Sequence, residues 1–201
     1  TSVSGLALMN DEHPDVPVYC GEIFQRTDAL GNLTHGIGDA GDRMFNNEYK
    51  DPSSKVEQSP RRPHNRPFII GIAGGRQLVT EATSLIAFEA TKKLQMRSVA
   101  VETEDGPKNV DVLRDEIGLV PILRSGLGMV DAMLGLFPDG QVWHIGMYRD
   151  HKTLVPVEYY NRLPAQPTAT VCYVLDPVLR TGGTASATCS VLKQAGIRDI
   201  R

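Results

Sequence analysis

The sequence predicts an α/β fold, with a mostly parallel sheet flanked by helices. Three stretches show the order that builds such a sheet: an apolar β-prone run, a short loop containing glycine, and a helical segment. The chain has 201 residues, of which 41% are hydrophobic, so it can bury one sizeable core. Because ligands of parallel sheets bind at the carboxyl ends of the strands, we expect the function to lie in those loops.

The clearest stretch is the last one. Residues 168–175 (TATVCYVL) form the apolar run, residues 176–184 (DPVLRTGGT) interrupt it, and residues 185–194 (ASATCSVLKQ) can form a helix. Gly196 follows, and glycine is the residue most often found just beyond a helix end. This part of the chain therefore predicts a buried strand, a loop and a helix.

The middle stretch repeats this order. It predicts a strand at 117–123 (IGLVPIL) and a helix at 127–137 (LGMVDAMLGLF), joined by the tripeptide 124–126 (RSG). A further apolar run at 142–148 (VWHIGMY) ends in Arg149. This run predicts another strand.

A helix is expected upstream, at 76–94 (RQLVTEATSLIAFEATKKL). Its apolar period places Leu78, Ala82, Leu85 and Ile86 on one stripe. We expect this stripe to lie in the core.

A polar segment with three prolines, residues 51–66 (DPSSKVEQSPRRPHNR), predicts a linker. It divides the chain into a first part, 1–50, and a longer part, 67–201, which we expect to form one folded domain together.

Composition excludes several classes of function. The formal net charge of −3 gives no overall positive field for nucleic acid. The three cysteines form no CxxC pair, so a reduced, cytoplasmic protein is expected. No apolar run reaches the roughly 18 residues that span a membrane, and the opening residues do not resemble a signal peptide.

The 176–184 loop carries the strongest chemical signal. Gly182 and Gly183 let backbone N–H groups approach a phosphate, and the following helix adds the positive end of its dipole. Thr181 and Thr184 add hydroxyl donors, and Asp176 is spaced to reach the diol of a ribose. An ordinary strand-to-helix turn is the alternative, because glycine-rich turns are common.

This loop resembles the phosphoribosyl pyrophosphate (PRPP) loop of type I phosphoribosyltransferases, in the Asp-Pro form of the uracil phosphoribosyltransferase family. Three further segments agree: 36–43 (GIGDAGDR), 120–134 (VPILRSGLGMVDAML), and 144–150 (HIGMYRD) with 156–160 (PVEYY). The resemblance implies a type I phosphoribosyltransferase-like fold with a small uracil-binding hood. It also implies formation of UMP and pyrophosphate from uracil and PRPP, by a homodimer or larger homo-oligomer.

The resemblance assigns roles to individual residues. Those in catalysis would be Arg124, Arg149, Asp176 and Asp39. PRPP would be bound by Arg124, Arg149, Asp39, Asp176, Pro177, Val178, Leu179, Arg180, Thr181, Gly182, Gly183 and Thr184. Backbone atoms of Leu33, Gly38, Asp39 and Ala40 would read uracil, and Asp39 would hold the expected cofactor, Mg²⁺.

Some of these residues have structural alternatives. Arg124 could serve only as an ion-pair partner, and Arg149 could pair with Asp150 at the surface. Tyr159 and Tyr160 either pack in the core or lie over the ribose.

The sequence also departs from the family. Arg180 stands where the family usually has a small residue, and residues 32–35 (NLTH) replace its usual Tyr-Ile-Val-Pro. These changes leave a non-catalytic uracil- or UMP-binding domain as an alternative. Residues 66–75 (RPFIIGIAGG) resemble the start of a uridine kinase P-loop, which leaves part of a uridine kinase-like fusion as a further alternative. They lack its Gly-Lys-Ser/Thr, so we interpret them as a structural strand and turn.

The order of segments differs as well. Residues 36–43 precede the 176–184 loop here, whereas the family has them after it. Reading residue 201 into residue 1 restores the family's order, so we expect a circular permutation, with the two ends close together and linker 51–66 joining the old ends. The alternative is that pieces of a longer or differently ordered chain share one running number.

Overall fold

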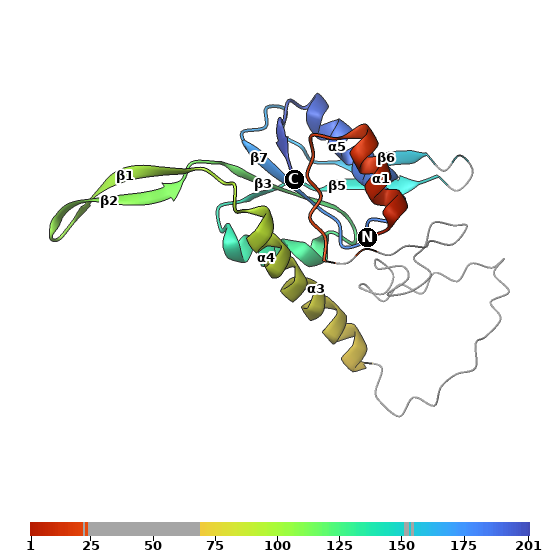
Figure 1. Cartoon of the computed structure of the whole chain (residues 1–201), viewed down its shortest axis with the longest axis horizontal. Helices are drawn as coiled ribbons and strands as arrows, with labels where there is room; N and C mark the ends of the chain where they lie inside the picture. The colour runs from red at the N-terminus through yellow and green to blue at the C-terminus, as the bar shows by residue number, and fades with distance from the viewer. Residues whose placement is uncertain (22, 24–68, 151–152, 154) are drawn as a thin grey trace.

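The computed structural model describes residues 1–21, 23, 69–150, 153 and 155–201, with the backbone alone for 69–76 (Figure 1). The 51–66 linker and the 36–43 segment lie outside the described residues. No helix in the described part is long and apolar enough to cross a membrane.

A six-stranded sheet forms the centre of the molecule, as the sequence predicts. Its main path runs β6-β5-β3-β7-β8, and β4 pairs with β3. Neighbours on this path are parallel except β5 and β6, which are antiparallel. The strands are β3 (Ile117–Leu123), β4 (Gln141–Val142), β5 (Ile145–Arg149), β6 (Pro156–Asn161), β7 (Val171–Leu175) and β8 (Asp199–Ile200).

Helices cover both faces of this sheet (Figure 1). Helices α3 (Ile69–Ala90) and α4 (Leu127–Leu136) lie on one face; α5 (Gly183–Gln194) lies on the other. Alternate residues of β7 enter the two cores: Tyr173 packs with α3 and α4, and Cys172 packs with α5. Both faces of β7 are therefore buried, which explains its continuous apolar sequence.

Helix α1 (Val3–Glu12) packs against α5 (Figure 1). Ser2 caps it, because its Oγ accepts the N–H of Gly5 at 2.9 Å. At the other end, buried His13 lies with Nε2 2.9 Å from the carbonyl oxygen of Ser186. The first residues of the chain thus lie beside its last helix.

Helix α3 corrects two expectations. It begins at Ile69, so the strand and turn expected at 66–75 are wrong. An apolar run this short fits either structure, and extending an existing helix costs less than starting a new element. The expected core stripe is wrong at Leu78 and Leu85, which are 65% and 76% exposed, whereas Ile86 is half-buried. The small residues Thr83 and Ala87 face the core instead. Small side chains allow this helix to lie close to its neighbours.

A two-stranded hairpin that the sequence analysis did not identify projects from the body (Figure 1). It consists of β1 (Met96–Thr103) and β2 (Gly106–Leu113), which pair antiparallel from end to end. Gly106 lies at the turn with φ of 103°, a conformation that favours glycine. The Asp-Gly dipeptide at 105–106 was the available signal.

Candidate active site

The carboxyl ends of three parallel strands bring the predicted polar residues to one edge of the sheet. Strand β3 pairs in parallel with β5 on one side and with β7 on the other. Arg124 follows β3, Arg149 is the last residue of β5, and Asp176 follows β7. The structure therefore brings these three residues to the same edge, although they are far apart in sequence.

At this edge, the connections that follow β3 and β7 lead to opposite faces of the sheet. After β3 the chain enters α4 on one face, and after β7 it enters α5 on the other. Such a change between neighbouring parallel strands leaves a crevice beyond their carboxyl ends, where α/β proteins bind ligands.

The 176–184 loop ends at the start of α5. Gly182 is the N-cap, with φ of 79°, and no side chain caps the helix. The first N–H groups of a helix have no carbonyl partner within it, so they and the helix dipole favour an anion here. The remaining loop residues lie where the sequence analysis placed them: Pro177, Val178, Leu179, Arg180 and Thr181 before the helix, and Gly183 and Thr184 in its first turn.

The two central glycines differ in their surroundings. A Cβ on Gly182 would lie 2.7 Å from the carbonyl oxygen of Gly5, so this glycine is required by packing as well as by φ. A Cβ on Gly183 would meet Pro156 Cγ at 3.5 Å and Thr181 Oγ1 at 3.9 Å, which are ordinary contacts. The space beside Gly183 is therefore not filled by the protein itself.

Asp176 is held in a defined orientation. Its Oδ1 accepts the backbone N–H of Val178 at 3.3 Å and the hydroxyl of Ser125 at 3.3 Å. Burial raises the pKa of Asp176 to about 6, although these two hydrogen bonds and the charges of Arg180 and the Thr1 amino group lower it. The carboxyl group is therefore ionised in most molecules at neutral pH.

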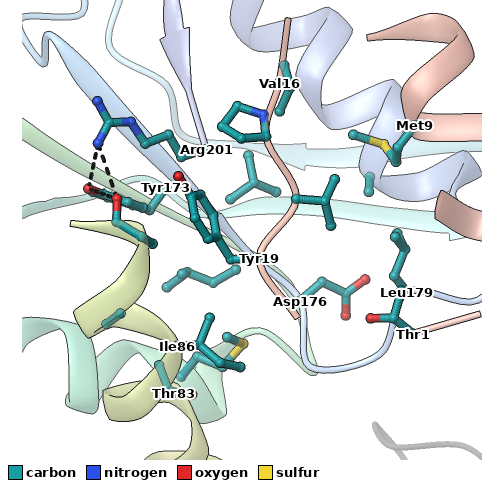
Figure 2. Close-up of a pocket in the computed structure, with 18 of the residues that line it drawn as sticks. Thr1, Met9, Val16, Tyr19, Thr83, Ile86, Tyr173, Asp176, Leu179 and Arg201 are labelled. Atoms are coloured by element: carbon teal, nitrogen blue, oxygen red, sulfur yellow. Dashed lines mark hydrogen bonds between the residues drawn. The ribbon is translucent and has the colours of Figure 1, made fainter. Parts of the chain in front are cut away.

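Asp176 also lines an apolar pocket of about 110 Å³. Figure 2 shows Thr1, Asp176 and Leu179 along one side of it, and Tyr173 and Arg201 on the other. The two ends of the chain thus border one pocket. Thr1 and Arg201 lie on opposite sides of this pocket (Figure 2). A circular permutation with no residue lost would place residue 1 directly after residue 201, so the permutation stays a prediction.

The start of the chain supports the 176–184 loop from behind. The N–H of Ser2 donates to the carbonyl oxygen of Leu179 at 2.8 Å, and the Ser2 hydroxyl donates to the carbonyl oxygen of Arg180. A Cβ on Gly5 would overlap that same oxygen of Arg180. The sequence analysis missed Ser2 and Gly5, because their contacts are formed only by tertiary packing.

Arg124 lies exposed in the turn after β3, and Arg149 is half-buried. Both make interactions in the structure. Tyr159 and Tyr160 are 54% and 39% exposed on β6, so packing in the core is excluded for both.

The residues predicted to bind uracil and the metal ion belong to a part of the chain that the structure does not describe. Leu33, Gly38, Asp39 and Ala40 all lie outside the described residues. Among the residues that are described, no three His, Cys, Asp or Glu side chains gather in a way that could hold a metal ion.

A mostly parallel sheet with an uncapped glycine loop and an acidic strand end at its switch point defines an α/β protein whose sheet edge suits an anionic ligand. Comparison with known proteins narrows this class. A family model for uracil phosphoribosyltransferase matches residues 73–201, more than half of the chain. The chain therefore belongs to the uracil phosphoribosyltransferase family.

Individual relatives agree. The uracil phosphoribosyltransferase of Roseiflexus castenholzii (strain DSM 13941 / HLO8) is 48% identical over 126 residues, which cover 63% of this chain and 61% of that protein. The one from Bacillus cereus (strain B4264) is 46% identical over 127 residues, with the same coverage. The chain thus spans about three-fifths of the length of these relatives. The solved structure of the AQ2163 protein from Aquifex aeolicus matches with a TM-score of 0.58 and 30% identity, over 65% of this chain and 61% of that one.

Proposed function

We propose that this chain is a uracil phosphoribosyltransferase, which makes UMP and pyrophosphate from uracil and PRPP. The observation that carries the proposal is the arrangement of Asp176, the uncapped start of α5 and the two arginines at one edge of the sheet. All of them fall within the region that matches the family.

In the proposed reaction, uracil N1 attacks C1′ of the ribose as the bond from C1′ to the pyrophosphate oxygen breaks. The electron pair of that bond leaves with pyrophosphate, and the N1 proton passes to solvent. Arg124 and Arg149 would stabilise the growing negative charge, because the guanidinium fork can donate two parallel hydrogen bonds to phosphate oxygens. The N–H groups at the start of α5 would hold the 5′-phosphate, and Asp176 would accept hydrogen bonds from the ribose hydroxyls.

Mg²⁺ is part of the proposal. When bound, it would neutralise charge on the pyrophosphate oxygens. The described edge offers the carboxylates of Asp176 and Asp150 beside Arg124, Arg149 and Arg180. This donor set fits an ion that keeps water and phosphate oxygens as most of its ligands, with Asp39 as the proposed protein ligand.

Uracil specificity is proposed from the resemblance alone, through the backbone of Leu33, Gly38, Asp39 and Ala40. The departures at 32–35 and at Arg180 keep a non-catalytic uracil- or UMP-binding domain as the second candidate. One assay separates the candidates: the protein is incubated with Mg²⁺ and either uracil plus PRPP or uridine plus ATP. UMP from the first mixture supports the transferase, UMP only from the second supports a kinase, and UMP binding without turnover supports the binding domain.

We also propose that the protein forms a homodimer. Three large apolar side chains on the outer side of α3, Leu78, Leu85 and Phe88, are 65%, 76% and 71% exposed. In the hairpin, Val99 pairs with Val110, so apolar side chains lie opposite each other on a ribbon that is marginally stable alone. A second copy would cover such surfaces. Light scattering should give twice the mass of the chain, and Leu85→Glu should give the monomer; a monomeric wild type would contradict the proposal.

A reducing compartment, the cytoplasm, is the proposed location. Cys20, Cys172 and Cys189 are free thiols, and burial raises the pKa of Cys172 to about 12 and that of Cys189 to about 11. Thiols with these pKa values stay protonated and unreactive at neutral pH.

A further inference from the structure

Ser125 connects the two loops that carry the proposed PRPP site. It lies in the 124–126 turn between β3 and α4, next to Arg124. Its Oγ donates to Oδ1 of Asp176 at 3.3 Å, across 51 positions of sequence. The resemblance assigns no role to Ser125, so this contact comes from the structure alone.

Close backbone packing fixes the position of the 124–126 turn. Gly126 is buried, and a Cβ there would overlap the carbonyl oxygen of Leu175, the residue before Asp176. The same Cβ would lie 2.7 Å from the backbone nitrogen of Ile122. The 124–126 turn therefore packs directly on the end of β7, with the Ser125 hydroxyl within reach of the Asp176 carboxylate.

We propose that Ser125 is a positioning residue, which holds the ionised carboxylate of Asp176 toward the ribose and joins the Arg124 turn to the 176–184 loop. This role rests on the proposed transferase function. A hydroxyl donor suits it, because a hydrogen bond to a carboxylate favours the ionised form and fixes the oxygen that accepts it. The second carboxylate oxygen then remains available for the substrate.

If Ser125 has this role, the effect of removing its hydroxyl on PRPP binding should depend on pH. Burial raises the pKa of Asp176 to about 6, and the protein groups that lower it are the Val178 N–H, the Ser125 hydroxyl and the Arg180 guanidinium. Removing one donor to the ionised form raises the pKa further. A smaller fraction of Asp176 is then ionised near pH 6, while nearly all of it is ionised well above pH 8.

The variant Ser125→Ala tests this proposal, with Ser84→Ala as the matched control. Ser84 is exposed on α3, where its hydroxyl donates to the carbonyl oxygen of Thr80 at 3.1 Å, away from the site. Carbon-13 NMR of the Asp176 carboxyl would follow its titration in the free protein, and calorimetry would measure PRPP affinity at pH 6 and pH 8. We expect Ser125→Ala to raise the pKa of Asp176 and to weaken PRPP binding about tenfold at pH 6 and less at pH 8. Ser84→Ala should change neither.

The outcomes are distinguishable. An unchanged Asp176 titration, or an equal loss of affinity at both pH values, would overturn the positioning role. If Ser125→Ala does not fold, Ser125→Cys keeps the size of the side chain with a weaker donor, and the same shift in the same direction is required. A wild type that neither binds PRPP nor makes UMP would remove the proposed function, whereas the NMR titration would still decide whether Ser125 controls Asp176.

Discussion

The N–H of Ser2 and the carbonyl oxygen of Leu179 form a hydrogen bond of 2.8 Å, which joins the start of the chain to the proposed phosphate site. Ser2 is almost fully buried, with 1% of its surface exposed. The loop that would receive PRPP is thus shaped by residues at the other end of the chain.

We therefore expect Gly5→Ala to impair the site without touching substrate. The added methyl group would overlap the carbonyl oxygen of Arg180, so the loop or α1 must move. Calorimetry should show PRPP binding weakened by at least about tenfold, with a loss of about 1–3 kcal/mol in unfolding free energy. Gly135→Ala in α4 is the control, since nothing lies within 4 Å of its Cβ position. Equal behaviour of the two variants would contradict the support role.

Gly183→Val should abolish PRPP binding and leave the fold intact. The free protein has room for its Cβ, but the side chain would occupy the position proposed for the phosphate. The comparison variant is Gly182→Ala, which should lower the unfolding free energy because of its φ of 79° and the contact with Gly5. Thermal unfolding and calorimetry on both variants check this difference. Full PRPP affinity in Gly183→Val would exclude the loop as the phosphate site.

Arg124→Lys should lower kcat/KM by about ten- to hundredfold although the charge is kept. A lysine cannot reproduce two parallel hydrogen bonds to pyrophosphate oxygens. Arg97→Lys in the exposed part of the hairpin serves as the control and should be neutral. Steady-state kinetics with PRPP as the varied substrate measure the effect. Unchanged kinetics would leave Arg124 with a structural role only.

Asp176→Asn should alter how stability depends on pH. The folded-state pKa of about 6 lies above the ordinary value of 3.8, so the folded protein favours the protonated carboxyl. The associated stability is present below pH 4 and is lost as the pH rises through 6, a loss of about 3 kcal/mol in total. Urea unfolding at pH 4.5 and pH 7.5 should therefore show the variant gaining relative to wild type at the higher pH. A constant difference between the two proteins would contradict the raised pKa.

Local patterns predicted much of the sheet and its helices. The strand at 117–123 and the helices after it and after β7 are confirmed, and Gly196 has the expected positive φ of 92°. These elements could be predicted because an apolar run and a glycine at a helix end are both features of the local sequence. The face of α3 could not be predicted because apolar residues lie on both of its sides, and the core selected the small ones.

The site divides in the same way. The resemblance singled out Arg124 and Arg149, and the glycines and Asp176 marked the 176–184 loop; all of them follow or end strands that the apolar runs predicted. Ser2, Gly5 and Ser125 carry no such pattern. Their importance depends on contacts between segments that are distant in sequence, and only the folded chain brings those together.

Hydrogen exchange in the projecting hairpin can be used to detect assembly of the protein. Its backbone hydrogen bonds join only β1 and β2, and most of its side chains are exposed. In a lone subunit these amides should exchange with deuterium through local opening, much faster than those of β3 and β7. Slow exchange in the hairpin would then measure assembly with another molecule, whereas slow exchange in the central strands measures folding.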